Sequence, residues 1–377
     1  MLVAAGMTVL VAGLWAQDEP GSQTVARPRK KPAGDTGNDS GNAPANPDND
    51  SAKIPSKLSP KATKDHVGET DATFTADTNV VNVDVQVIDP HGNPIPNLNK
   101  EYFRILEDNV PQTLTQFSTT EAPMTVAMVI EFSNRFQAFY TNGWAETLTA
   151  SYGFVQSLKP EDYVAVIAYD LQTTILSDFS ADRTKTMEAL SRLRIPGFSE
   201  SNMFDAITDT ADRMSKIEGR KAILLIASGI DTFSKLTYDK TRKALQESGV
   251  PVYSIEMLQL ERLVAEPYMG ASQQLDFLQA DNELKTFAKE TGGQAYFPRF
   301  MQELPGVFQQ ISQSLRNQYS LGYASNNQAR DGKFRKLTIQ LVKPGTNEPL
   351  KMTDQKGKTM KYTIIAKAGY VAPRAVE

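Results

Sequence analysis

Between residues 125 and 316, short apolar segments alternate with longer segments of helical periodicity, and this alternation constrains the fold more than any other feature. Nearly continuous apolar runs are typical of strands that helices cover on both faces. Strands separated by helices need crossover connections, which produce a mainly parallel sheet between two helical layers. The expected strands are 125–130, 163–169, 173–179, 221–227, 252–256 and 294–297. The expected helices are 144–158, 182–193, 202–217, 238–247, 275–290 and 303–316. We therefore predict a doubly wound, Rossmann-like α/β fold.

Strand patterns also flank this region on both sides. Ahead of it, residues 80–89 alternate apolar and polar side chains, and 103–108 and 114–118 have strand character. Behind it, strand patterns return at 319–323, 334–342 and 362–366. Because each set alone has too few strands for a core of its own, we predict that the two sets pack together as one small β unit.

The N-terminal region differs in composition from the rest of the chain. The 14 residues from Leu2 to Trp15 are mostly apolar and carry no charge. A membrane-spanning helix needs about 20 residues, so segment 1–16 is predicted to be a secretory signal, cleaved after Ala16 or retained as an anchor. A buried helix of the fold is the alternative. Residues 17–72 are rich in Pro, Gly, Asn and Ser, which predicts a disordered linker.

These boundaries give the expected domain organisation. After the segments 1–16 and 17–72 come a β segment at 73–121, the α/β domain at 122–318 and a second β segment at 319–377.

Composition excludes several classes of function. The chain has no cysteine and only two histidines, His66 and His91, which we expect at the surface. Thiolate chemistry and Cys-bound zinc are therefore excluded, and the two histidines leave almost no candidate for the base of a Ser-His-Asp triad. The net charge is −4, and the sequence shows no excess of basic residues of the kind that nucleic-acid binding requires. The loops after the expected strands lack the Gly-rich spacing of a phosphate loop. We predict neither an enzyme nor a nucleic-acid partner.

Ligands of an open doubly wound sheet bind at the C-terminal ends of its strands. Two loops at that edge follow strands, at 131–135 and 228–232, and a third precedes a helix at 197–202. The candidate partner-binding residues in these loops are Glu131, Ser133, Asn134, Arg135, Ser201, Ser228 and Asp231.

Three regions then carry a family resemblance in a consistent order. The α/β region contains Asn-Met-Phe-Asp-Ala-Ile at 202–207 and Ile-Ala-Ser-Gly-Ile-Asp-Thr-Phe-Ser at 226–234. Ahead of it lies 103–112, and behind it 323–335. Together, residues 78–374 resemble the bacterial VWFA-related proteins common in acidobacteria, which contain a von Willebrand factor A-like domain. The resemblance implies an A-type α/β domain that binds proteins and catalyses nothing.

Domains of this family usually carry a metal-ion-dependent adhesion site. The pattern that the resemblance implies is D-x-S-x-S after the first strand, a Thr in a later loop and an Asp after the fourth strand. In this chain Glu131 stands at the first Asp, and only Ser133 matches. Arg135 replaces the second Ser, Ser201 stands for the Thr, and Ser228 takes the place of the last Asp.

These departures predict a degenerate site without magnesium or another cofactor. Mg²⁺ needs an octahedron of oxygen ligands, and a fixed guanidinium repels a divalent cation. If any metal binds, its ligands would come from Glu131, Ser133, Ser201 and Asp231. Two hypotheses remain for Arg135. It either replaces the metal, binding Glu131 and leaving donors for a partner's carboxylate, or points outward from a degenerate surface.

The expected function is an exported protein-binding module of the adhesion type, in the periplasm, the envelope or outside the cell. The partner is expected to be a protein, with membrane contact only through an uncleaved N-terminal segment. The alternative is a scaffold or assembly subunit of an envelope complex that contacts partners through the flanking β unit. We expect the aromatic residues Phe297, Phe300, Tyr319 and Tyr323 in the core.

Overall fold

A computed structural model describes residues 80–119, 122–134, 144–194, 196–353 and 357–374. All of them belong to one compact unit of the chain. None of the helices among these residues combines the length and the apolar character that a membrane span requires.

The α/β domain is built on a six-stranded sheet with the strand order β10-β9-β8-β5-β6-β7. Its strands are β5 (Met124–Glu131), β6 (Tyr163–Tyr169), β7 (Thr173–Ser180), β8 (Arg220–Ala227), β9 (Val252–Glu256) and β10 (Ala295–Tyr296). All neighbouring strands run parallel except β7, which pairs antiparallel with β6. The predicted doubly wound, mainly parallel α/β class is therefore confirmed.

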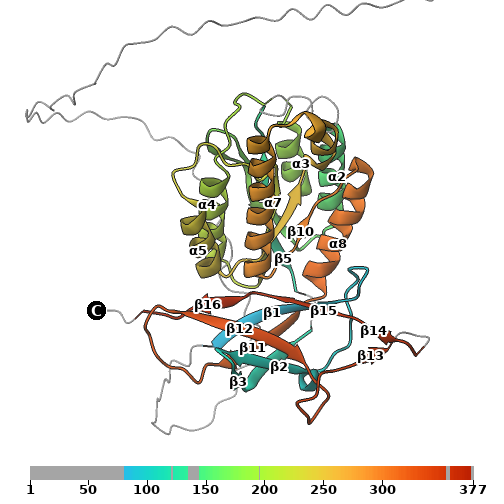
Figure 1. Cartoon of the computed structure of the whole chain (residues 1–377), viewed down its shortest axis with the longest axis vertical. Coiled ribbons are helices and arrows are strands. Elements are labelled where there is room, and N and C mark those ends of the chain that lie inside the picture. The colour runs from blue at the N-terminus through green and yellow to red at the C-terminus, as the bar shows by residue number, and fades with distance from the viewer. Residues whose placement is uncertain (1–79, 120–121, 135–143, 195, 354–356, 375–377) are drawn as a thin grey trace, which may run out of the picture. The chain divides into compact units, whose positions relative to one another are not determined.

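The alternation of side chains along β5 explains the two helical layers. Met128 and Ile130 face one core together with Phe154 of α2, whereas Ala127 and Val129 face a second core. One layer contains α2 (Trp144–Ser157), α3 (Arg183–Ser191) and α8 (Leu304–Arg316). The other contains α4 (Met203–Ser215), α5 (Tyr238–Ser248) and α7 (Ala271–Thr291). Figure 1 shows these helices covering the sheet. Because both faces are covered, the central strands need apolar side chains at nearly every position.

Local signals set several helix ends. α3 begins after Asp182, whose carboxylate accepts a hydrogen bond from the backbone N–H of Thr184 at 2.9 Å. α5 and α7 both stop at glycines with left-handed backbone, Gly249 at φ 64° and Gly292 at φ 87°. α6 (Gln259–Ala265) and the 3-10 turns η1 (Lys100–Tyr102), η2 (Glu266–Tyr268) and η3 (Met301–Glu303) complete the helical elements of the described residues.

The strands before and after the α/β domain form the β unit together, as predicted. One sheet has the order β15-β1-β11-β4 and the other the order β16-β12-β2-β3. The strands before the domain are β1 (Val80–Ile88), β2 (Phe103–Glu107), β3 (Val110–Gln112) and β4 (Leu114–Ser118). Those after it are β11 (Tyr319–Ala324), β12 (Phe334–Leu341), β13 (Met352–Thr353), β14 (Thr359–Met360), β15 (Thr363–Ala366) and β16 (Gly369–Val371).

A buried carboxylate ties the two sheets of the β unit together. Glu107 of β2 accepts hydrogen bonds from Tyr323 of β11 at 2.6 Å and from Tyr370 of β16 at 3.0 Å. The hydroxyl of Ser325 donates to the same carboxylate at 2.7 Å. Three neutral donors therefore compensate for the burial of one charge, which would otherwise be costly.

Some predictions lie outside the described residues. These are the signal-like segment 1–16, the linker 17–72 and the position of Arg135. The expected domain boundaries at 121 and 318 also remain predictions, because the described residues form a single compact unit.

Candidate functional site

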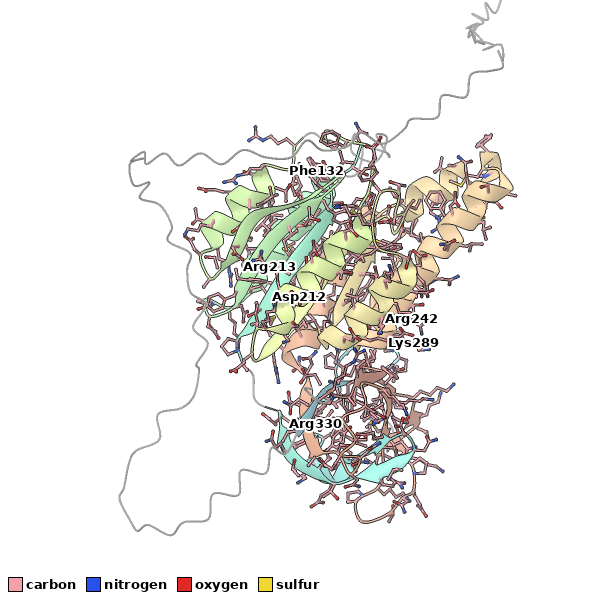
Figure 2. All side chains as sticks on the ribbon, turned by 90° about the vertical axis from the view of Figure 1, so that its left-hand side faces the viewer. Phe132, Asp212, Arg213, Arg242, Lys289 and Arg330 are labelled. Carbon is pink, nitrogen blue, oxygen red and sulfur yellow. The ribbon has the colours of Figure 1, made fainter. Side chains whose placement is uncertain are left out.

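The predicted loops lie where the strand order of the sheet reverses. β5 lies in the middle of the sheet, and β6 and β7 follow it toward one edge. The chain then returns to the middle with β8, and β9 and β10 follow toward the other edge. The crevice outside the C-terminal ends of β5 and β8 is therefore the topological switch point, the usual ligand position in such sheets. Figure 2 shows Phe132, the first residue after β5, at this edge of the domain. We call this edge the strand-end face. It comprises the loops 131–134, 197–202 and 228–236, the α6–α7 segment 257–278 and the turn 297–300 after β10.

The structure brings Glu131, Ser133 and Ser228 into direct contact. Glu131 is the last residue of β5, and only 1% of its surface is exposed. One carboxylate oxygen accepts from Ser133 Oγ at 3.0 Å. The other accepts from Ser228 twice, from the backbone N–H at 2.7 Å and from Oγ at 2.8 Å. The methylene that Glu has beyond Asp lets this carboxylate reach the loop of the neighbouring strand.

Backbone hydrogen bonds join the third loop to the other two. The N–H of Asn134 donates to the carbonyl of Phe198 at 2.6 Å. Thr232 bonds Ser201 in both directions, with its N–H donating to the Ser201 carbonyl at 2.8 Å and its Oγ1 accepting from the Ser201 N–H at 2.9 Å. The Ser201 hydroxyl is buried and has no hydrogen-bond partner among the described residues. Asn134 and Ser201 thus help to fix the shape of the face.

Asp231 serves the start of α4. One carboxylate oxygen accepts from the backbone N–H of Phe204 at 3.1 Å and from the hydroxyl of Ser234 at 2.5 Å. Phe204 lies in the first turn of α4, where free N–H groups favour a negative charge. Burial nevertheless raises the pKa of Asp231, because the loss of water outweighs these hydrogen bonds. Nearby, Asp205 accepts from the N–H groups of Lys235 and Leu236, so it also binds backbone.

The carboxylate oxygens of these loops are already engaged in hydrogen bonds within the protein. The carboxylate of Glu131 already accepts three hydrogen bonds, and that of Asp231 is bound to α4 and Ser234. In the described part of the chain, no group of three or more His, Cys, Asp and Glu side chains is arranged to hold a metal ion. A hard cation would have to displace these internal donors before it could collect six oxygens.

The largest feature that the sequence did not reveal is a set of exposed apolar side chains on the strand-end face. Phe198 and Phe233 belong to its loops, and Phe300 follows β10. On α6, η2 and the first turns of α7, the exposed residues are Leu263, Val264, Tyr268, Leu275 and Leu278. Tyr268 is 90% exposed and Phe233 is 54% exposed. The prediction of Phe300 as a core residue was wrong, whereas Tyr319 and Tyr323 are buried as predicted.

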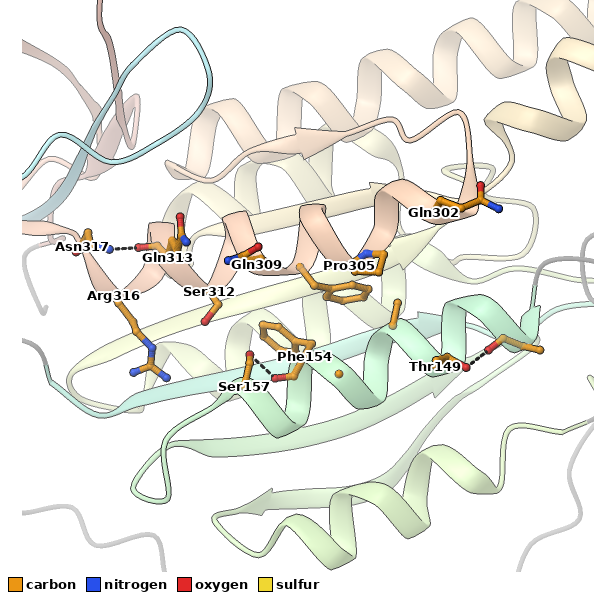
Figure 3. Close-up of a pocket in the computed structure, with 14 residues that line it drawn as sticks. Thr149, Phe154, Ser157, Gln302, Pro305, Gln309, Ser312, Gln313, Arg316 and Asn317 are labelled. Atoms are coloured by element: carbon orange, nitrogen blue, oxygen red, sulfur yellow. Dashed lines mark hydrogen bonds between the residues drawn. The ribbon is translucent and has the colours of Figure 1, made fainter. Parts of the chain in front are cut away.

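A separate groove of about 750 Å³ lies between α2 and α8, away from these loops. Figure 3 shows Phe154 reaching from α2 toward α8, where its ring lies 5.5 Å from that of Phe308. One charged residue lines the groove, Arg316, and its guanidinium is paired with the buried carboxylate of Asp162 at 2.8 Å. The groove therefore offers apolar and uncharged polar side chains but no unpaired charge.

Comparisons with known proteins give structural neighbours only. No protein-family model and no curated protein matches the chain. Among solved structures, it is similar to a von Willebrand factor type A protein from Catenulispora acidiphila, with 12% identity, a TM-score of 0.40 and coverage of 75% of this chain and 76% of that one.

Two further similar structures cover about half of this chain. One is an aerotolerance-related membrane protein from Bacteroides fragilis, with 14% identity, a TM-score of 0.40 and coverage of 51% of this chain and 98% of that one. The other is the vWF domain of the type V pili tip protein Mfa5 from Porphyromonas gingivalis, with 13% identity, a TM-score of 0.39 and coverage of 51% and 96%. The α/β class of this chain rests on its own sheet topology.

Proposed function

We propose that this chain is a non-catalytic protein-binding module that captures a partner on the strand-end face without a metal ion. The resemblance of residues 78–374 to VWFA-related proteins supports the A-type domain, and the apolar stretch Leu2–Trp15 supports export. The single observation that carries the proposal is the set of exposed apolar side chains on the loops and the α6–α7 segment of the strand-end face.

The composition of this face matches that of a partner-binding surface. Isolated apolar residues on a protein surface need no explanation, but a contiguous group marks an interaction site. Aromatic side chains such as Phe198, Phe233, Tyr268 and Phe300 are the types that anchor protein interfaces. The group spans the loop before α4, the loop after β8, the α6–α7 segment and the turn after β10.

The loops under these side chains are held in place before any partner binds. Asn134 is bonded to Phe198, Ser201 to Thr232, and Asp231 to the start of α4. A surface that is already ordered loses less conformational entropy on association, and its affinity rises accordingly. In this proposal Glu131, Ser133 and Ser228 form the internal bridge of the face, and the apolar side chains make the contacts.

Capture from an envelope extract tests the proposal. The double variant Phe233→Ser/Tyr268→Ser removes two exposed anchors and should fold normally, since both side chains point to water. We expect it to lose the partner that the wild-type chain retains, both in EDTA and in Mg²⁺. The matched control, Val110→Ser/Ile175→Ser, removes two exposed apolar residues elsewhere and should capture normally. Equal capture by all three proteins, or capture that needs a divalent cation, contradicts the proposal.

A second candidate is the scaffold subunit that contacts its partners through the β unit. One observation favours it: β16 pairs with β12 only over Phe334–Lys336, which leaves the second half of β12 without a strand on that side, beside a groove. Under this function, removing residues 73–118 and 319–377 abolishes association, whereas the Phe233→Ser/Tyr268→Ser variant leaves it intact.

A further inference from the structure

A second surface, separate from the strand-end face, lies between α7 and the β unit. It is a groove with a volume of about 920 Å³. Lys285 and Lys289 of α7 line one side, and residues from β12 and β15 line the other. The apolar side chains of Ile339 and Ile364 line it as well, and both pack against the core of the β unit. The groove thus combines strand backbone, apolar side chains and lysines.

The open edge in this groove arises because the last strand of the chain changes sheets. β15 pairs with β1 in one sheet, and β16 then pairs with β12 in the other. The β16 pairing covers only Phe334–Lys336, whereas β2 pairs with β12 over Leu337–Leu341 on the opposite side. The second half of β12 therefore has a strand partner on one side only.

Ile339 carries the unpaired backbone groups of this edge. On the open side, the N–H of Leu337 donates to Ala368 at 2.8 Å, and the carbonyl of Leu341 accepts from Leu350 at 2.9 Å. Alternate residues of a strand direct their backbone polar groups to the same side, so those of Ile339 point there too. No partner for them is present among the described residues. One donor and one acceptor are thus available to an added strand.

The charges around the groove favour an anionic partner. Its one acidic lining residue, Glu290, is neutralised by Arg242 through two hydrogen bonds of 2.7 and 2.5 Å. Lys289 is exposed and forms no ion pair with any described residue. The ammonium of Lys285 lies 4.5 Å from the centre of the Phe297 ring, and 4.0 Å from Asp281, which Arg262 already binds at 2.7 Å. The lysines therefore leave an excess of positive charge.

We propose that this groove binds an extended, acidic peptide segment of a partner protein, which adds as a strand beside β12. The peptide's backbone pairs with Ile339, its carboxylates face Lys285 and Lys289, and its alternate apolar side chains contact Ile364. Main-chain pairing supplies affinity in this mode, and the side chains supply specificity. The opposing explanation is that the lysines only protect an open edge from unwanted pairing, as they do in many proteins.

Fluorescence anisotropy of labelled synthetic peptides tests the proposal on the full chain. The probe alternates Val and Glu, and it is compared with a Val-Lys peptide and with a Val-Glu peptide whose backbone is N-methylated. We expect saturable binding of the first probe only. Lys289→Glu should weaken it about tenfold, because one attraction becomes a repulsion. Lys185→Glu, on the exposed side of α3, is the matched control and should bind as the wild type does.

Amide hydrogen exchange distinguishes strand addition from a purely electrostatic contact. The Val-Glu probe should slow the exchange of the Ile339 amide at least tenfold at saturation, because that N–H gains a partner. Absence of saturable binding, equal binding of the N-methylated peptide or unchanged exchange at Ile339 would each overturn the proposal. These outcomes are independent of the proposed function, because the peptide experiments test the groove beside β12, whereas the capture experiment tests the strand-end face.

Discussion

Glu131 and Ser228 are joined by two hydrogen bonds, from the Ser228 backbone N–H at 2.7 Å and from its hydroxyl at 2.8 Å, to the same carboxylate oxygen. Glu131 is the last residue of β5, and Ser228 is the first residue after the neighbouring parallel strand β8, on either side of the point where the strand order reverses. A direct polar bridge therefore connects the two loops that the sequence resemblance aligns with the metal site of A-type domains. We propose that this bridge replaces the metal as the element that fixes the two loops.

The bridge predicts a difference between two substitutions of Glu131. Glu131→Ala leaves the Ser228 N–H without its acceptor in a buried site, and we expect a loss of about 3 kcal/mol in the free energy of unfolding. Glu131→Gln should cost about 1–2 kcal/mol, because the amide oxygen can still accept from Ser228 while the Ser133 hydroxyl turns to accept from the amide N–H₂. Urea unfolding measures both. Glu188→Ala, at an exposed position of α3, is the control, and equal losses in all three variants would contradict the role of the bridge.

Asp162 is a second buried carboxylate whose loss should be costly. It accepts from the backbone N–H groups of Met124 at 3.0 Å and Lys159 at 2.7 Å, and pairs with Arg316 at 2.8 Å. These bonds tie the start of β5 to the end of α8. Asp162→Ala should lower the free energy of unfolding by about 3–5 kcal/mol, because the Arg316 charge is left half-buried and unpaired. Asp162→Asn keeps one of the two acceptor oxygens, enough for the N–H of Met124 or that of Lys159, and should cost less, so equal losses in urea unfolding would refute this assignment.

Glu256 gives the protein a defined dependence of stability on pH. Burial raises its pKa to about 8, well above the ordinary value of about 4.5 for a glutamate side chain. Below pH 4.5 both the folded and the unfolded chain hold this proton, so Glu256 adds no pH dependence there. Between pH 4.5 and 8 the unfolded chain releases the proton first, so stability falls as pH rises, and above pH 8 the effect levels off.

Glu256→Gln should remove this part of the pH dependence. The amide cannot ionise, and its oxygen can still accept from the Leu258 N–H, as the carboxylate does at 2.9 Å. Relative to the wild type, the variant should therefore become more stable as pH rises from 5 to 8, by an amount of a few kcal/mol. Urea unfolding at several pH values measures this difference in the free energy of unfolding. If the free energies of the two proteins changed with pH in parallel, Glu256 would have the same pKa in the folded and the unfolded chain, and the prediction would be wrong.

Much of the fold could be predicted because local patterns determine it. The buried strands β5, β6, β8 and β9 show as apolar runs, and Gly249 and Gly292 mark the ends of α5 and α7. β16 and α6 were missed. β16 has three residues and exists only through its pairing with β12, and α6 has seven residues without a buried apolar stripe evident from sequence.

The candidate site was predictable only in its location. Glu131, Ser133 and Ser228 do lie together, since the topology places the ends of β5 and β8 side by side. The attachment of Asp231 to the start of α4 was not predictable, because it depends on a backbone N–H 27 residues away. Exposure of Phe233 and Phe300 has no sequence signal, since an apolar residue in a loop can turn inward or outward.

The central claim is that the strand-end face works without a metal ion, and thermal unfolding tests it most directly. A ligand that binds the folded state raises its apparent stability by mass action. The triple variant Glu131→Asp/Arg135→Ser/Ser228→Asp, which restores the residues of the family's metal site, is the positive control. We predict that millimolar Mg²⁺ or Mn²⁺ leaves the Tm of the wild-type chain at its value in EDTA while raising that of the triple variant. A reproducible, metal-dependent rise in the Tm of the wild-type chain would contradict the claim.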